Sequence, residues 1–214
     1  MAENLAITIG RQYGSGGSEI AKRLGELLGI KVYSTELISL AAEKKGVSPE
    51  FLSRVDEKAT SSFLYTVATG ASFYRNHHFS PDLPINDQLF ILQTEIVKEA
   101  IAEEPAIFVG RCADYILRKH QKRISLFIYA DEADRVARVM EREGCNAKQA
   151  QDLMTKNDKR RTSYYNFYTG KKWGRSENYH LSINSSLLGI EGTAQFLAQI
   201  LPHFSVQNDE IAGK

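Results

Sequence analysis

Short runs of apolar, often β-branched residues alternate along the chain with longer stretches in which apolar residues recur at helical spacing. The short runs predict buried strands at residues 5–10, 31–33, 106–110, 124–130 and 180–185. The longer stretches predict helices at residues 19–28, 87–104, 111–120, 131–144, 146–168 and 188–201. Because strands and helices alternate, we expect a three-layer α/β/α fold with a largely parallel sheet that is covered by helices on both faces.

The region between the second and third predicted strands contains several helix-start signals. Thr35 is expected to cap one helix, and Ser48 followed by Pro49 marks the start of another. Residues 59–80 favour a helix and then a loop. Asn86 is expected to cap the long helix that follows it.

The predicted elements follow one another without a linker or an internal repeat, which indicates a single domain over residues 1–204. Residues 47–104 are expected to form a helical insertion in this domain. Residues 145–178 are expected to form a mobile helical segment. The tail at residues 205–214 is expected to be flexible.

A glycine-rich run, Gly14 to Ser18, is the sharpest chemical feature of the sequence. It follows a predicted strand and opens a helix, so its backbone N–H groups and the positive end of the helix dipole point at one place. A glycine-rich surface turn is the plain alternative, but the flanking strand and helix favour phosphate binding. The residues expected to bind phosphate are Gly14, Ser15, Gly16, Gly17 and Ser18.

This run lacks the lysine of the usual phosphate loop, GxxxxGK[ST]. Aligned on Gly16 and Ser18, the chain has Gly17 at the lysine position and Arg11 at the first glycine position. A charge about 4 Å from a phosphate oxygen is worth roughly 4 kcal/mol at an effective dielectric constant near 20. Arg11 is the nearest replacement, since a guanidinium can hold two phosphate oxygens at once. Ser18 keeps the hydroxyl that would ligate Mg²⁺.

A second motif, Gly110-Arg111, lies at the end of a predicted buried strand. Ligands of open α/β sheets bind beyond the carboxyl ends of the strands, so Arg111 is expected to point into a binding crevice. The alternative for Arg111 is a surface ion pair. Asp114, in the next helix, fits either a binding role or a structural one. Cys112 is expected to be a small buried residue.

Three sequence runs, ITIGRQYGSGGSEIAKRLGELLGI, FVGRCADYIL and DKRRTSYYNFYTGKKWGRSENYHLSINSS, resemble the cytidylate-kinase-like branch of the P-loop nucleoside monophosphate kinases. The resemblance runs from the first predicted strand to the last helix. An Arg at the position of Arg11 and a Gly at that of Gly17 are common in this branch, although true cytidylate kinases have the lysine. The resemblance implies transfer of the γ-phosphate of ATP, with Mg²⁺, to a nucleoside monophosphate, with CMP or dCMP favoured.

The resemblance also assigns roles to single residues. A Gly-Arg-Asp run of cytidylate kinases contacts the acceptor nucleotide, which implies substrate binding for Arg111. Here Cys112 stands where that Asp would be, and Asp114 is the nearest substitute. Arg138 corresponds to a region that contacts the donor nucleotide.

Residues 156–175 carry a net charge of +6, with seven basic residues and one acidic residue among aromatic ones. Phosphoryl transfer needs cations around the phosphates, and in monophosphate kinases a lid carries such arginines. Asp158-x-x-Arg161 resembles the lid motif of cytidylate kinases. Arg161 is therefore the expected lid catalyst, and Asp158 either orients it or contacts the substrate. Arg160 is the alternative to Arg161.

Arg135, Arg138 and Arg142 share one face of the helix predicted at residues 131–144, because they follow one another at helical spacing. Acidic residues lie among them in the sequence. We therefore expect this face to be solvated, with the donor-nucleotide role implied for Arg138 as the alternative.

The whole chain has 214 residues and a formal net charge of +1, so the part outside residues 156–175 carries −5. This uneven distribution favours a compact anion such as a nucleotide over a long polyanion. Basic residues interleaved with aromatic ones also suit nucleic acid binding, but a single-strand binder needs no phosphate loop. Nucleic acid is therefore the less favoured partner.

The two cysteines, Cys112 and Cys145, form no CxxC pair, which argues against a disulfide framework or a zinc module. The N-terminus has no secretory pattern, and no apolar run reaches the roughly 18 residues of a membrane span. We expect a cytoplasmic protein without a membrane partner, and a homodimer is left open. Two functions remain: a phosphotransferase, or a nucleotide-binding regulatory protein with weak or no catalysis.

Overall fold

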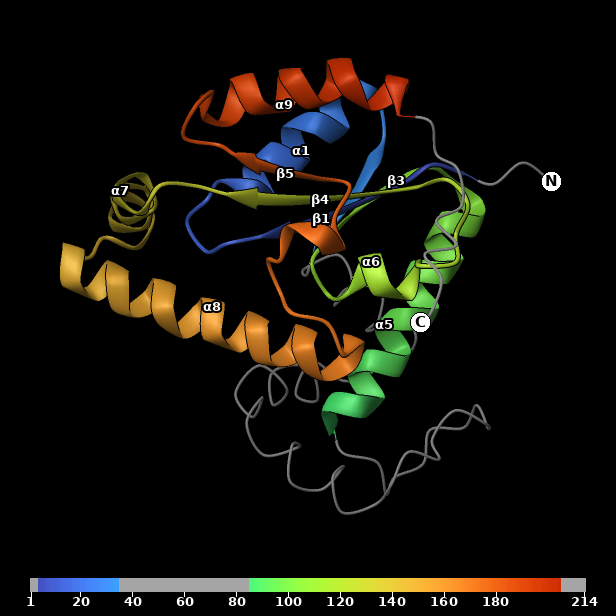
Figure 1. The fold of residues 1–214 in the computed structure, drawn as a ribbon, viewed down its shortest axis with the longest axis horizontal. Coiled ribbons are helices and arrows are strands. Elements are labelled where there is room, and N and C mark those ends of the chain that lie inside the picture. Colours follow the sequence, from blue (N-terminus) through green and yellow to red (C-terminus); the bar gives the residue numbers. More distant parts are fainter. Residues whose placement is uncertain (1–3, 35–84, 205–214) are drawn as a thin grey trace. The chain divides into compact units, whose positions relative to one another are not determined.

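The structure is a computed structural model, and it describes residues 4–34 and 85–204 (Figure 1). A five-stranded parallel sheet with the strand order β2-β3-β1-β4-β5 forms its centre. Its strands are β1 (Ala6–Arg11), β2 (Lys31–Tyr33), β3 (Ala106–Val109), β4 (Arg123–Tyr129) and β5 (Leu181–Asn184). All five predicted strands and their parallel arrangement are confirmed.

Within the described residues, each strand is followed along the chain by at least one α-helix. These helices are α1 (Gly17–Leu28), α5 (Ile85–Glu103), α6 (Ala113–Ile116), α7 (Glu132–Glu143), α8 (Ala147–Thr169) and α9 (Gly189–Ile200). One 3₁₀ turn, η1 (Ser176–Asn178), precedes β5, and a second, η2 (Leu201–His203), follows α9 near the end of the described part. In Figure 1, α1 and α9 cover one side of the sheet, and α6 and α8 lie on the other side. The expected three-layer α/β/α fold is therefore confirmed.

In the part of the chain that the structure describes, the predicted helices match observed ones except at residues 111–120, and one of the two predicted caps that can be checked holds. The helix expected over residues 111–120 is only the single turn α6. It starts late because Arg111 and Cys112 adopt left-handed backbone angles. The helix α5 begins at Ile85, so Asn86 lies in its first turn and is not its cap. The predicted start at Asn146 is confirmed, since its side chain accepts the Gln149 N–H in a reciprocal capping box.

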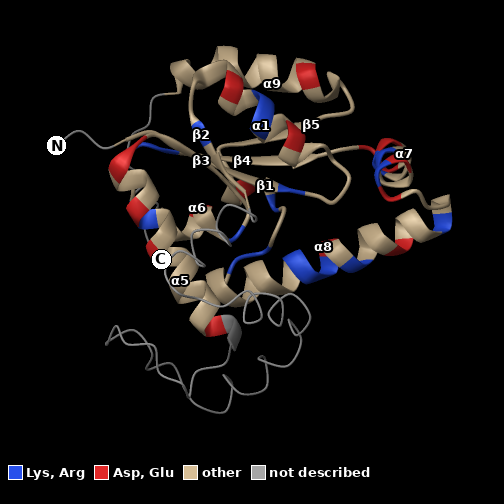
Figure 2. Cartoon of the chain, turned by 180° about the vertical axis from the view of Figure 1, so that it is seen from behind, with Lys and Arg blue, Asp and Glu red and all other residues tan. Residues whose placement is uncertain are grey.

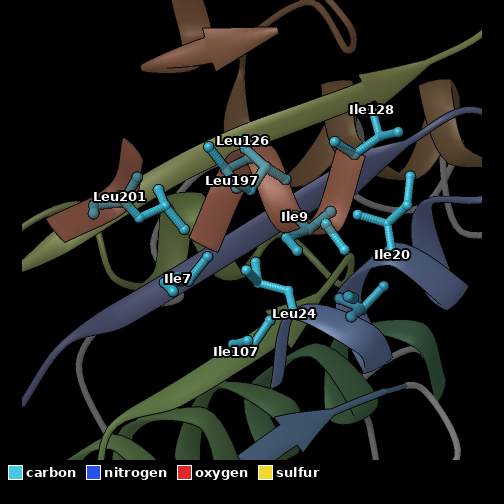
Figure 3. Close-up of a cluster of buried hydrophobic side chains, with 13 residues drawn as sticks. Ile7, Ile9, Ile20, Leu24, Ile107, Leu126, Ile128, Leu197 and Leu201 are labelled. Carbon is cyan, nitrogen blue, oxygen red and sulfur yellow. The ribbon is translucent and has the colours of Figure 1, made fainter. Parts of the chain in front are cut away.

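The core of the sheet lies between β1, β3, β4 and the two helices α1 and α9 (Figure 3). Ile7 and Ile9 of β1 meet Leu24 of α1 and Leu197 of α9, and all four side chains are at most 1% exposed. Each such side chain contributes about 1.5–3 kcal/mol on burial. This core fixes the carboxyl ends of β1, β3 and β4 relative to one another, which is where the candidate site lies.

A smaller apolar cluster joins α7 to α8. Val139 of α7 packs with Ala150 and Met154 of α8, and Tyr13, from the loop after β1, packs against this cluster. The pair of helices α7 and α8 therefore forms an arm whose apolar inner side receives the loop.

The chain forms two compact units, one of residues 1–35 and 97–214 and one of residues 36–96. Every candidate site residue named above belongs to the first unit. The helix starts expected at Thr35 and Ser48, and the insertion expected at residues 47–104 as a whole, fall largely outside the described residues, and the insertion stays a prediction. No helix of the described part is long and apolar enough to cross a membrane.

Candidate active site

The loop between β1 and α1 is tightly packed and depends on glycine at two positions. Gly14 and Gly16 have φ angles of 78° and 75°, in the left-handed region that favours glycine. A Cβ atom on Gly14 would lie 2.9 Å from the carbonyl oxygen of Arg135, and one on Gly16 would lie 2.9 Å from Ile190 Cγ1. The glycines therefore let the loop fit between α7 and the start of α9.

The start of α1 presents backbone N–H groups in the manner expected of a phosphate loop. The N-cap of α1 is Gly16, which has no side chain to accept from the first N–H groups of the helix. Within the described part of the chain, no hydrogen bond engages the N–H groups of Gly16, Gly17 and Ser18. The Ser18 side chain is exposed at the first turn. Ser15 differs, because it is buried and its N–H and hydroxyl both donate to the Gln12 carbonyl, at 3.3 and 2.9 Å.

Arg11 lies beside the position where the usual lysine would start. A Cβ atom on Gly17 would lie 2.5 Å from Cβ and 3.0 Å from Cγ of Arg11. At the other end of the same side chain, a Cβ atom on Gly110 would collide with Nη1 of Arg11. Arg11 therefore runs from the start of α1 to the end of β3, and its aliphatic part fills the space that a lysine at position 17 would need.

The turn after β3 is strained. Gly110, Arg111 and Cys112 have φ angles of 75°, 54° and 56°, which places three consecutive residues in the left-handed region. For a residue with a Cβ atom this conformation costs about 1–2 kcal/mol. Such strain gathers at functional sites, because the surrounding fold must hold it in place. Arg111 is thus fixed, half-buried, at the strand end where the sequence predicts it.

Cys112 is 3% exposed, as expected for a small buried residue. Burial raises the pKa of its thiol well above the ordinary value, so the thiol stays protonated. A nucleophilic role for this cysteine is therefore not supported.

Replacement of Gly110 with alanine should destabilise the fold by about 1–3 kcal/mol, from left-handed strain and the displaced Arg11 guanidinium. Gly29→Ala is the matched control, since Gly29 has a φ of 64° and open space around its Cβ position. Urea unfolding measures both. Equal losses of unfolding free energy in the two variants would show that the Arg11 side chain moves away from the new Cβ atom without an energetic cost.

α8 holds the loop through two side chains. The Asp158 carboxylate accepts the Tyr13 N–H at 2.8 Å, and Arg161 Nη1 donates to the Arg11 carbonyl oxygen at 2.8 Å. Arg160, the alternative to Arg161, is exposed. The structure thus brings Asp158 and Arg161 to the phosphate loop, as the lid resemblance implies, but their contacts here are with the loop backbone.

α7 reaches the same loop, which corrects the expectation of a solvated face for Arg135 and Arg138, whereas Arg142 is exposed. Arg135 donates through Nε to the Tyr13 carbonyl oxygen at 2.8 Å and forms an ion pair with Asp158, and its side chain is only 11% exposed. Arg138 Nη1 donates to the Gly14 carbonyl oxygen at 3.1 Å. The expectation failed because helical spacing shows which residues share a face and cannot show what packs against that face.

Tyr13 is a site residue that the sequence did not single out. Its ring lies under two guanidinium groups, 4.6 Å from Arg142 and 5.5 Å from Arg161, and its hydroxyl donates to Glu143 at 2.9 Å. Burial and the bond to Glu143 raise the pKa of its phenol. A bulky aromatic residue inside a glycine-rich loop was the only signal available.

Basic residues gather on α8, beside the loop. Figure 2 shows the Lys and Arg residues of α8 along its middle turns, where Arg161 contacts the end of β1. Desolvation lowers the pKa of Arg161, yet a guanidinium remains charged at neutral pH. No group of three or more His, Cys, Asp or Glu residues able to hold a metal occurs within residues 4–34 and 85–204. A metal ion here would rely on phosphate oxygens and single side chains such as Ser18.

Asp114 lies in a partly buried polar cluster. The Tyr165 hydroxyl donates to Asp114 Oδ2 at 2.7 Å, and Arg123 Nη1 donates to the Asp114 carbonyl oxygen at 3.0 Å. Burial raises the pKa of the Asp114 carboxyl, and the bond from Tyr165 opposes that rise. Burial and the nearby Asp114 charge raise the pKa values of Tyr165 and Tyr179 strongly.

These tyrosines predict a loss of stability at high pH. The unfolded chain releases the Tyr165 proton near pH 10, whereas the folded chain keeps it, so stability is intact below that pH and falls above it. In Tyr165→Phe this decline should be shallower by about 1.4 kcal/mol per pH unit. Urea unfolding between about pH 9 and 11.5 tests this, and parallel curves for the two proteins would refute it.

The parallel sheet and the glycine-rich loop that joins β1 to α1 give the chain the fold of the P-loop kinases. The sequence profile of the cytidylate kinase-like family matches residues 6–187. The chain belongs to this family, and is a nucleotide-dependent kinase-like protein. No curated protein sequence matches it.

Solved structures support the same fold. An uncharacterized protein from Eubacterium ventriosum ATCC 27560 is 29% identical with a TM-score of 0.70, and the match covers 94% of this chain and 100% of that one. Shikimate kinase from Acinetobacter baumannii, in complex with shikimate, is 14% identical with a TM-score of 0.51, covering 95% and 96%. Shikimate kinase from Bacteroides thetaiotaomicron is 15% identical with a TM-score of 0.51, covering 92% and 98%. At these identities the two shikimate kinases show the fold alone.

Proposed function

We propose that this protein transfers the γ-phosphate of ATP to a nucleoside monophosphate, with CMP or dCMP as the favoured acceptor. The position of Arg11 carries the proposal. Its side chain starts where the lysine of the usual phosphate loop would lie, next to Gly17, and reaches Gly110 at the end of β3. A cation in that place bridges the two sites between which a phosphoryl group would pass.

The residues around the loop fall into two groups, one for the phosphate donor, ATP, and one for the phosphate acceptor, the monophosphate. The backbone N–H groups of Gly16, Gly17 and Ser18 would bind the phosphates of ATP, and Arg138, beside Gly14, would lie near the donor nucleotide. The Ser18 hydroxyl fits one ligand position of Mg²⁺, which when bound neutralises charge on the phosphate oxygens. Arg111 would hold the acceptor. Arg161, Arg11 and Arg111 supply the positive charge that phosphoryl transfer requires.

A phosphate acceptor fits the carboxylates of this site better than a hydroxyl acceptor does. A hydroxyl group must lose a proton to a base, whereas a phosphate monoester attacks through an oxygen that is already anionic, since its second pKa is about 6. The two candidate carboxylates within the described residues both have hydrogen-bond partners: Asp158 accepts from Tyr13 and Arg135, and Asp114 accepts from Tyr165. Positioning and charge then suffice for the reaction.

A coupled assay of ADP release tests the proposal. With ATP and Mg²⁺, it compares CMP, dCMP, UMP and AMP as acceptors, and shikimate as a hydroxyl acceptor. We expect turnover with at least one monophosphate and none with shikimate. If ATP binds and no monophosphate is phosphorylated, the phosphotransferase proposal is wrong.

The second candidate is a nucleotide-binding regulatory protein with weak or no catalysis. It is favoured by the missing lysine and by the bonds that tie the loop to α7 and α8. ATP at about 100 times its Kd would then stabilise the fold by about 2.7 kcal/mol, which corresponds to a rise in Tm of roughly 5–10 °C. Such a rise without turnover would support this candidate.

A further inference from the structure

One face of α8 contacts both halves of the candidate site. Asp158, Arg161 and Tyr165 follow one another at intervals of three and four residues, so they project from the same side of the helix. Their positions span about 10 Å along a continuous helix, at about 1.5 Å per residue. Because α8 is unbroken from Ala147 to Thr169, a shift of one of these contacts moves the others.

The first two residues of this face, Asp158 and Arg161, contact the donor side of the site, which is the loop proposed to bind ATP. Asp158 accepts the Tyr13 N–H and Arg161 donates to the Arg11 carbonyl oxygen, both at 2.8 Å. These bonds fix the backbone of the loop just before its phosphate-binding turn. They also fix the start of the Arg11 side chain.

The third residue holds the acceptor side. The Tyr165 hydroxyl donates to Asp114 Oδ2 at 2.7 Å. Asp114 is the second residue of α6 and lies two residues after Cys112, the last residue of the strained turn. The carbonyl oxygen of Asp114 is held separately by Arg123 of β4. The backbone of Asp114 is thus bound to the sheet, whereas its carboxylate contacts α8.

We propose that Tyr165 is a positioning residue that couples the acceptor side of the site to the phosphate loop. When the monophosphate binds at Arg111 and Asp114, it sets the position of Tyr165. The helix α8 transmits this position to Asp158 and Arg161. ATP and the monophosphate then bind with positive synergy. The synergy rests on the proposed function, whereas the mechanical link between Tyr165 and the loop does not.

Hydrogen exchange tests the link without any substrate. In Tyr165→Phe, the Tyr13 amide, which Asp158 holds, should exchange about two- to tenfold faster than in the wild type, as expected for loss of one hydrogen bond's support. Tyr115→Phe is the matched control, since Tyr115 is next to Asp114 and its half-buried ring lies under the exposed Arg118. Unchanged exchange at Tyr13 in Tyr165→Phe, with the α6 amides affected, would overturn the proposal.

Binding of ATP with and without CMP tests the synergy. We expect saturating CMP to lower the Kd for ATP about fivefold or more in the wild type and in Tyr115→Phe, and hardly at all in Tyr165→Phe. The Kd for ATP alone should change less than about twofold, because Asp158 and Arg161 remain. Equal synergy in all three proteins overturns the coupling. If CMP and the other monophosphates do not bind at all, the proposed function fails, and the exchange result alone decides on the link.

Discussion

Replacement of Arg11 with alanine is expected to lower kcat for phosphoryl transfer about a thousandfold while the chain still folds. Removal of an arginine that stabilises the transferring phosphoryl group typically costs a factor of this size. The Arg11 side chain lies between Gly17 and Gly110 and belongs to no apolar core cluster of the described residues, so folding should survive its truncation. Steady-state kinetics with ATP and the best acceptor measure the loss, and circular dichroism checks the fold.

A matched control separates this role from a general loss of positive charge. Arg23→Ala removes an arginine of α1 that forms exposed ion pairs with Glu26 and Glu191, and its kcat should stay within about twofold of the wild type. A wild-type rate in Arg11→Ala would show that this residue does not replace the lysine.

The position of Arg11 also predicts how the usual motif can be restored. Gly17→Lys alone should not raise activity and should destabilise the fold by about 1–3 kcal/mol, because the new Cβ meets the Arg11 stem at 2.5 Å. Arg11→Gly together with Gly17→Lys rebuilds the full GxxxxGK[ST] pattern. We expect this double variant to be at least tenfold more active than Arg11→Gly alone. Equal rates would show that the two cations are not interchangeable here.

The strands, the phosphate loop and most helix limits could be predicted because their signals are local. The β-branched run at Ala6–Ile9 and the glycines that follow it dictate a buried strand and a turn, whatever the rest of the chain does. Asn146 and Gln149 are likewise a complete local signal for a helix start.

The contacts that build the site could not be predicted, because they join residues far apart in the chain. Arg135 meets Asp158 across 23 residues, and Tyr13 meets Asp158 across 145. Nothing in the sequence around Arg111 and Cys112 indicates left-handed backbone angles, which non-glycine residues adopt only when the fold imposes them. The predicted start of a helix at residue 111 was wrong for this reason.

Replacement of Arg161 with alanine is expected to lower kcat a hundred- to a thousandfold, and Arg160→Ala is its matched control. The two arginines are neighbours in α8, but only Arg161 reaches the loop, where it donates to the Arg11 carbonyl oxygen at 2.8 Å and lies 5.5 Å from the Tyr13 ring. Arg160 is exposed, so its loss should change kcat less than about threefold.

The lysine variant of Arg161 separates charge from geometry. A guanidinium has five N–H donors, so Arg161 can keep its bond to the Arg11 carbonyl while other donors face a phosphate, whereas an ammonium group is a point charge. Relative to Arg161→Ala, Arg161→Lys should therefore bring the KM for ATP part of the way back to the wild-type value, because ATP binding depends on charge. It should restore little of kcat, because kcat depends on the placement of the donors in the transition state. If Arg161→Lys restores both, the electrostatic charge alone is what the arm supplies. If Arg160→Ala is as damaging as Arg161→Ala, neither arginine acts at the loop, and α8 contributes only its general positive potential.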